Sequence, residues 1–403
     1  KLNIATLALA DVSKSGGYGG NGTWRFEQFG NVVLACNDNK KIQAWTIGVS
    51  TVFADVAAAA PIAKDIAIVR DFVFAGNLLG GTEPEKVQWS DINDETDWVS
   101  GATSQSDFQI IADGGNVQAI TGGEFGVIFL EKSVVRASYV GSPLFFQFDT
   151  ISSGLGCLEG NSVARYGNIS FFLSDDGWYS TDGQTVTNIG LEKIDRWFLS
   201  RVDLTQINTM SAAVDPVKNL VVWNYADVDG NRRILIYNWQ LQKWSRAETT
   251  SDVVGTIATL GETLETLQSS LGYTNIDTMP ASLDSRLFIG GKFLFAGAIG
   301  NKIVVFTGAS ITPQLITTDI EIGYNSVATL ARPQIDNGTA QVAVASRREL
   351  DDNIEFGAFV PTTTEGRCSL RSAGRYHRFN VQPTGNWTTA MAVDVDLKPQ
   401  GNR

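Results

Sequence analysis

The sequence is poor in the residues from which most metal and acid–base sites are built. Its 403 residues include a single histidine, His377, and three cysteines, Cys36, Cys157 and Cys368. The cysteines lie far apart and form no CxxC pair, so they provide neither a disulfide framework nor a zinc signature, and we expect buried free thiols in a reducing cytoplasm. One histidine cannot build a His-containing metal cluster within one chain. We therefore predict no metal, no cofactor, no catalytic residue and no enzymatic activity.

Positive charge and long apolar runs are scarce as well. The chain carries 31 Lys and Arg against 43 Asp and Glu, a net charge of −12. A protein that coats nucleic acid needs a basic excess to neutralise phosphates, so the balance argues against that class. No apolar run is long enough to span a bilayer, and we expect no membrane insertion. The chain begins at Lys1 rather than at a methionine, which leaves room for an upstream segment.

What is abundant favours short strands and tight turns. There are 40 glycines but only 10 prolines, aromatic residues reach 10%, and hydrophobic residues make up 43% of the chain. Aromatic and β-branched residues favour strands, and glycine favours the turns between them. The composition therefore predicts an ordered, mainly β protein with a large core.

Strand-like runs recur in pairs that are split by turns. The six pairs are 31–36 with 42–47, 71–76 with 86–90, 126–130 with 133–139, 168–173 with 177–180, 219–225 with 233–237, and 292–296 with 302–306. Their starting points lie 40 to 55 residues apart, except for a last gap of 73. This spacing is typical of propeller blades, so it predicts a β-propeller of about six blades, with room for irregular ones.

The rest of the chain suggests three further segments. Residues 1–22 are too rich in glycine for regular structure, and we expect a flexible N-terminal arm before a propeller over 23–310. Leu264, Leu267 and Leu271 share one helical face, which predicts a short inserted helix near 261–285 in the last gap; a second short helix is predicted over 191–199. Longer alternating strands predict a separate C-terminal β-sandwich or barrel-like domain over 311–403, used for oligomer or partner contacts.

Three motifs resemble functional sites but fit them poorly. Asp175 and Asp176 suggest the paired carboxylates of a glycosidase. However, Trp178 occupies a position where the sialidase Asp-box requires glycine or threonine. We therefore expect a turn between strands. Asp227 and Asp229 resemble the start of a calcium loop without its remaining ligands. The glycines at 16–22 lack the Gly-Lys-Ser/Thr of a phosphate-binding loop.

One local basic cluster stands out, formed by Arg371, Arg375, His377 and Arg378. One interpretation is a solvated strand face. The other is a subunit or partner contact in which the arginines pair with carboxylates of a neighbour, and a nucleic-acid contact is a third. From residue 331 onward the chain holds nine basic and eight acidic residues, so the acidity belongs to the propeller part.

Several stretches of the sequence resemble the tail nozzle or tail hub proteins of short-tailed bacteriophages, a group that includes packaged-DNA stabilisation and tail tubular proteins. The resemblance covers most of residues 24–403. It lies in GLGC at 154–157, NSVARYG at 161–167, ISFFLSDDGWY at 169–179, IG at 189–190, IDRWF at 194–198, DPVKNLVVWNY at 215–225, ILIYN at 234–238, KWS at 243–245, GRYHRF at 374–379, GNWT at 385–388 and VDV at 393–395. None of these motifs is catalytic.

The resemblance implies a virion tail protein that is made and assembled in the cytoplasm of a bacterial host. It implies a homohexameric ring below the portal-adaptor complex that retains the packaged genome, carries spikes, fibres or a needle, and passes double-stranded DNA without reading its sequence. A negatively charged lumen would repel phosphates and so would not trap the duplex. Two alternatives remain open: a glycan-binding or glycan-hydrolysing propeller, and a propeller scaffold for cellular complexes, although the chain lacks Trp-Asp repeats.

Overall fold

The computed structural model of the chain describes residues 10–19, 23–258, 293–306, 312–385, 387 and 389–400. The chain divides into two compact units, residues 1–306 and residues 307–403. Both units consist mainly of antiparallel strands, as the composition predicted.

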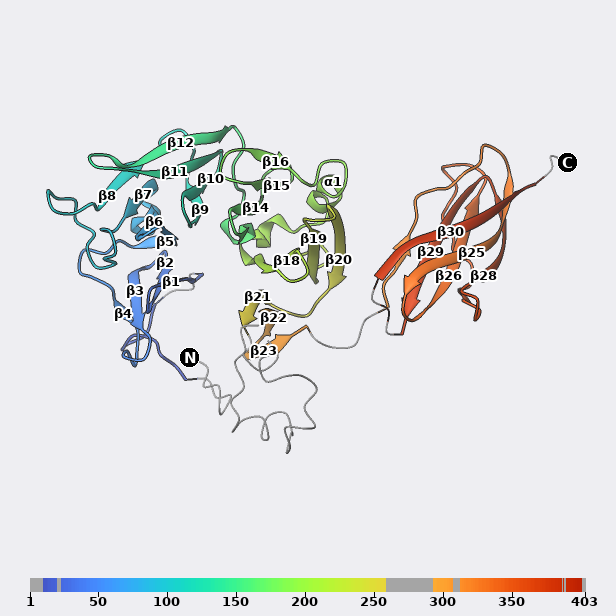
Figure 1. Ribbon diagram of the computed structural model, residues 1–403, viewed down its shortest axis with the longest axis horizontal. Helices are drawn as coiled ribbons and strands as arrows, with labels where there is room; N and C mark the ends of the chain where they lie inside the picture. Colours follow the sequence, from blue (N-terminus) through green and yellow to red (C-terminus); the bar gives the residue numbers. More distant parts are fainter. Residues whose placement is uncertain are drawn as a thin grey trace, which may run out of the picture. The chain divides into compact units, whose positions relative to one another are not determined.

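The first unit contains six antiparallel sheets whose strands follow one another in sequence order, the blade pattern of a β-propeller (Figure 1). Five blades have four strands, and the sixth has three among the described residues. Blade 1 contains β1 (Arg25–Phe29), β2 (Val32–Asn37), β3 (Lys40–Thr46) and β4 (Ala54–Asp55), and blade 2 contains β5 (Ala63–Val69), β6 (Phe72–Leu78), β7 (Glu83–Trp89) and β8 (Asp107–Ile110). Blade 3 contains β9 (Val117–Thr121), β10 (Gly126–Leu130), β11 (Ser133–Gly141) and β12 (Phe145–Ser153), and blade 4 contains β13 (Ala164–Tyr166), β14 (Ile169–Leu173), β15 (Trp178–Thr181) and β16 (Val186–Asn188). Blade 5 contains β17 (Ser211–Asp215), β18 (Leu220–Ala226), β19 (Arg232–Asn238) and β20 (Lys243–Glu248), and blade 6 contains β21 (Val253–Ala258), β22 (Phe293–Ile299) and β23 (Lys302–Val305).

The prediction of about six blades is confirmed, and the six predicted strand pairs are the second and third strands of the six blades. Several of the second strands, such as β2, β6, β10 and β18, were easy to recognise because nearly all of their residues are buried. In β6, Phe72 and Phe74 pack toward blade 3, whereas Val73 and Ala75 pack toward blade 1. The strand therefore reads as a continuous apolar run rather than an alternating one.

A separate apolar cluster joins each pair of neighbouring blades from blade 1 to blade 6. Among the described residues, no such cluster joins blade 6 to blade 1. Packing between successive blades thus holds the propeller together, and each blade contributes one face to each neighbour.

Among the described residues, helical structure is limited to short connections. One α-helix, α1 (Asp195–Leu199), follows blade 4, and three short 3-10 helices are η1 (Leu79–Gly81), η2 (Gly160–Ser162) and η3 (Leu204–Thr209). Helix α1 lies within the predicted helix at 191–199 but is shorter than it. The inserted helix predicted near 261–285 lies outside the described residues.

The N-terminal arm differs from the expected flexible segment over residues 10–19, which lie on blade 1. The carbonyl oxygen of Val12 accepts a hydrogen bond from the backbone N–H of Phe53 at 2.8 Å, and Lys14 Nζ lies 2.7 Å from Asp55 Oδ1. The ring of Tyr18 packs edge-on against Trp24, with 4.6 Å between ring centroids. Residues 10–19 form no strand or helix, and the Val12 carbonyl, the Lys14 ammonium and the Tyr18 ring hold them against blade 1.

The second unit is a β-sandwich. One sheet has the order β24 (Leu315–Ile316), β29 (Tyr376–Thr384), β26 (Thr339–Arg347), β27 (Val360–Pro361); the other has the order β28 (Cys368–Gly374), β25 (Ser326–Asp336), β30 (Thr389–Pro399). Apolar side chains from both sheets form one core that includes Val342, Phe379 and Leu370.

Candidate functional site

An axial cavity of about 800 Å³ lies at the centre of the propeller. Its lining includes residues of the first strand of every blade, namely β1, β5, β9, β13, β17 and β21. Innermost strands converge on the axis of a propeller, so this cavity is the axial channel of the fold. It is the place where residues far apart in the sequence meet around one enclosed space.

Four charged side chains line this channel: Arg25 and Glu27 from β1, Asp65 from β5, and Arg165 from β13. Asp65 is buried, and its Oδ1 lies 3.6 Å from Arg25 Nε, while its Oδ2 accepts a hydrogen bond from the backbone N–H of Ile120 at 2.7 Å. Burial raises the pKa of the Asp65 carboxyl, and Arg25 and the backbone donor oppose that rise.

Glu27 is open to the water of the channel, yet protein surrounds it on several sides. The resulting loss of hydration, together with the negative charge of Asp65, raises the pKa of Glu27 to about 7. Arg165 and Arg25 oppose the rise. Loss of hydration also lowers the pKa of Arg165, whose Nε donates a hydrogen bond to the carbonyl oxygen of Gly167 at 2.7 Å.

The sequence did not predict that these four residues meet, because they are spread over 140 residues and only Arg165 lies in a stretch that was singled out, NSVARYG. The only signal was a set of charges within otherwise apolar strands, such as Asp65 in AKDIAIV. Among the described residues, no group of three or more His, Cys, Asp and Glu side chains is placed to hold a metal ion.

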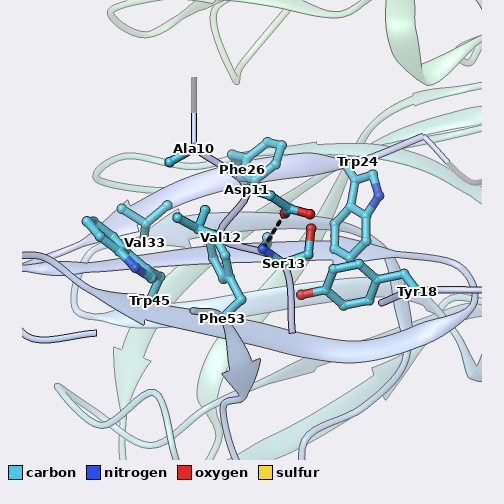
Figure 2. Close-up of a pocket in the computed structure, with 11 residues that line it drawn as sticks. Ala10, Asp11, Val12, Ser13, Tyr18, Trp24, Phe26, Val33, Trp45 and Phe53 are labelled. Atoms are coloured by element: carbon cyan, nitrogen blue, oxygen red, sulfur yellow. Dashed lines mark hydrogen bonds between the residues drawn. The ribbon is translucent and has the colours of Figure 1, made fainter. Parts of the chain in front are cut away.

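A second cavity, of about 490 Å³, is an apolar groove on blade 1. Figure 2 shows Asp11, Val12 and Ser13 of the N-terminal arm among the side chains of this groove. Its aromatic lining consists of Tyr18, Trp24, Phe26, Trp45 and Phe53. Phe26 stays 59% exposed, so the arm covers the groove only in part.

The predicted contact cluster of the C-terminal unit does not form one surface, because His377 is fully buried between the two sheets of the sandwich. Its Nε2 lies 2.9 Å from Ser326 Oγ and its Nδ1 lies 2.7 Å from Ser346 Oγ. A buried neutral imidazole can donate one of these hydrogen bonds and accept the other. His377 is thus a core residue, and the expectation that its side chain contacts a partner is corrected.

The arginines of that cluster have separate surroundings. Arg378 donates two hydrogen bonds to Asp319, at 2.9 and 2.8 Å, and Asp319 also accepts one from Arg347 at 2.6 Å. Arg375 pairs with Glu321 at 3.1 Å. Two of the three arginines therefore already pair with carboxylates of the same chain, while Arg371 is exposed on β28.

The acidic motifs occupy turns. The backbone N–H of Ser174 donates to the carbonyl of Gly177 at 2.8 Å, which closes the turn between β14 and β15 around Asp175 and Asp176. In the turn between β18 and β19, Arg201 lies 2.9 Å from Asp227 and Arg233 lies 2.7 Å from Asp229. These arginines occupy the carboxylates that a calcium ion would need.

The junction between blades 4 and 5 brings together several of the sequence stretches that were singled out in the sequence analysis. Asp195 Oδ1 accepts a hydrogen bond from the backbone N–H of Trp178 at 3.0 Å. The Trp178 ring lies 4.1 Å from that of Trp223 and 5.1 Å from that of Phe198. Three separate stretches of the resemblance thus form a single packing unit rather than a reactive site.

No known family model matches the chain, and no curated protein matches it. Solved structures similar to the chain include the computationally designed Ika8 protein, at 13% identity over 72% of this chain and 84% of that one with a TM-score of 0.36. Others are the WD40 β-propeller domain of Doa1, at 11% identity over 73% and 95% with a TM-score of 0.38, and PorZ of the type-IX secretion system of Porphyromonas gingivalis, at 10% identity over 72% and 32% with a TM-score of 0.36. No helix in the described part of the chain is long and apolar enough to cross a membrane.

Proposed function

We propose that the chain is a structural subunit of the tail of a short-tailed bacteriophage, one copy of a homohexameric nozzle ring. The ring closes and lines the DNA exit channel below the portal-adaptor complex, retains the packaged DNA and anchors other tail parts. In this role the subunit transmits load and performs no chemistry.

The observation that supports this proposal is the junction of blades 4 and 5. The stretches DGW at 176–178, IG at 189–190 and IDRWF at 194–198 carry the resemblance, and they interlock around Asp195 and Trp178. Proteins that share a fold need similar residues to pack it together. Such packing residues differ from the converging polar groups of an enzyme site.

The charge of the chain is compatible with the proposed role. Each subunit carries a net charge of −12, so a ring of such subunits repels the phosphates of a moving duplex if its carboxylates face the lumen. The axial channel described above belongs to a single propeller. The passage for DNA would instead be enclosed between subunits.

The test is the assembly state of the full chain. Light scattering and negative-stain electron microscopy over increasing concentrations, alone and with portal-adaptor complexes, are expected to reveal closed six-fold rings. A protein that stays monomeric at high concentration and also beside adaptor complexes would contradict the proposal. Turnover of a sugar from a glycan panel, lost on a single substitution, would favour the glycan-cleaving alternative.

A further inference from the structure

The axial channel holds two positive and two negative side chains, and they are not all neutralised by contact. Arg25 and Asp65 form a pair at 3.6 Å. Within the described part of the chain, Glu27 and Arg165 form no ion pair within 4 Å, although each shifts the pKa of the other through its charge. Both side chains line the same cavity, and they come from different strands, β1 and β13.

Such an arrangement favours a ligand with two opposite charges of its own. When all four side chains are ionised their charges sum to zero, so a lone anion or cation would leave one sign unbalanced beside them. A ligand with an ammonium at one end and a carboxylate at the other can meet Glu27 and Arg165 together. Arg is well suited to the carboxylate end because its fork of N–H donors matches two oxygens.

The size and walls of the channel suit a small molecule. Its volume of about 800 Å³ lies within the range of small-molecule sites, and its lining mixes polar and apolar groups. Trp24, Ile120, Val163 and Tyr166 provide apolar surface around the charged residues. Each charged residue stands on a paired strand or its edge, so the rigid blades hold the positions of their backbones.

We propose that the axial channel of the propeller binds a small zwitterion of the amino-acid type, with its ammonium group at Glu27 and its carboxylate at Arg165. Asp65 and Arg25, paired at 3.6 Å, line the same channel and leave Glu27 and Arg165 as the charged groups of its described lining without an ion-pair partner. This site is independent of ring formation, so it can be tested whether or not the chain assembles.

The site also predicts proton release on binding. Glu27 is faced by Arg25 of its own strand, by Asp65 of β5 and by Arg165 and Tyr166 of β13. A ligand ammonium beside Glu27 favours its charged form and lowers its pKa, which is about 7 in the free protein. Binding near neutral pH therefore displaces a proton, and affinity falls as the solution becomes more acidic.

Isothermal titration calorimetry of the full chain with each of the twenty amino acids tests the proposal. Acetate and methylammonium serve as probes with only one of the two charges. At least one amino acid is expected to bind at least about 10-fold more tightly than either single-charge probe. Repeating that titration at pH 7 in buffers of different ionisation enthalpy is expected to show proton release.

Two substitutions test whether the side chains of Glu27 and Arg165 themselves bind the ligand. Glu27→Gln and Arg165→Gln are each expected to weaken binding at least about 10-fold, and Glu27→Gln also abolishes the proton release. Glu355→Gln and Arg348→Gln, at exposed positions of the second unit, are the matched controls and should leave binding unchanged. Circular dichroism and melting curves confirm that each variant is folded.

Three results would overturn the proposal. The first is that no amino acid binds at millimolar concentration. The second is that acetate or methylammonium binds as well as the amino acid does. The third is that folded Glu27→Gln and Arg165→Gln proteins keep the affinity of the original chain.

Discussion

Asp195 lies where a side chain at position 190 would begin: a Cβ placed on Gly190 would stand 1.8 Å from Asp195 Oδ1. The same carboxylate would lie 2.3 Å from a Cβ on Gly177. Two glycines from different turns thus make room for one carboxylate at the start of α1. This contact explains why a glycine precedes the helix and why another precedes Trp178.

Replacing Gly190 by alanine is expected to destabilise the propeller by about 3 kcal/mol, because the added methyl group overlaps a buried carboxylate that rigid blades hold in place. Chemical or thermal unfolding measures the change. Gly101→Ala is the matched control, since a Cβ there meets only the carbonyl oxygen of Val99 at 4.0 Å. If the two variants were equally stable, the junction of blades 4 and 5 would accommodate the added methyl group at position 190 without a loss of stability.

The second unit is expected to lose stability on acidification through His377. Burial lowers its pKa below 6.5 in the folded state, so the unfolded chain takes up the proton first as the pH falls. The free energy of unfolding should therefore decrease below about pH 6.5, by up to about 1.4 kcal/mol per pH unit. Unfolding curves between pH 8 and pH 5 measure this slope.

The control for this prediction separates His377 from its charged neighbours. A folded His377→Asn variant should show a flatter pH dependence than the original chain over the same range. Arg371→Gln, at an exposed position of the same unit, should keep the slope. A slope that survives in His377→Asn would assign the effect to other groups.

Glu27 predicts the opposite pH dependence for the propeller. Its pKa rises from 4.5 to about 7 on folding, so the folded chain holds this proton more tightly than the unfolded chain does. Stability is then lost as the pH rises from 4.5 through about 7. Glu27→Gln should raise the melting temperature at pH 8 by roughly 1–2 °C, a small gain because channel water screens the charge.

At pH 4 both forms of residue 27 are neutral, so the two proteins should melt together there. A melting temperature several degrees lower for the variant at pH 8 would mean that the Glu27 carboxylate makes a stabilising contact. That outcome would contradict the assigned cause of the pKa shift.

The three cysteines are expected to resist modification in the native protein. All three are buried, and burial raises their pKa values, that of Cys157 to about 12. Because the thiolate is the reactive form, a thiol reagent such as DTNB should not label the folded chain but should label every cysteine after denaturation. Rapid labelling without denaturant would indicate that a blade or the sandwich opens locally.

The blade strands were predictable because their signal is local. Apolar runs such as FVFAGNL in β6 and ISFFL in β14 lie between turn residues, and their spacing follows the blade period. The helix at 191–199 was predicted from one apolar face, but the structure begins it only at Asp195. The Asn188 side chain accepts hydrogen bonds from Gly190 and Leu191 and so holds the preceding residues in a turn.

The C-terminal cluster shows where local pattern fails. GRYHRF at 374–379 alternates as a strand should, and alternation alone leaves open which of its two faces meets the opposite sheet. His377 points inward because Ser326 and Ser346, from two other strands, offer it hydrogen-bonding partners. Neither serine is near His377 in the sequence.

Strand alternation, glycine at turns and the recurrence of hairpins are properties of neighbouring residues, so the sequence by itself determined the β class, the six blades and the change to a different β unit near residue 310. The tertiary structure decided which side chains share a space. Glu27 and Arg165 are 138 positions apart, and only the closing of blades around an axis brings them to one channel. Their altered pKa values arise from that enclosure, because a side chain loses water and gains charged neighbours only when distant strands surround it.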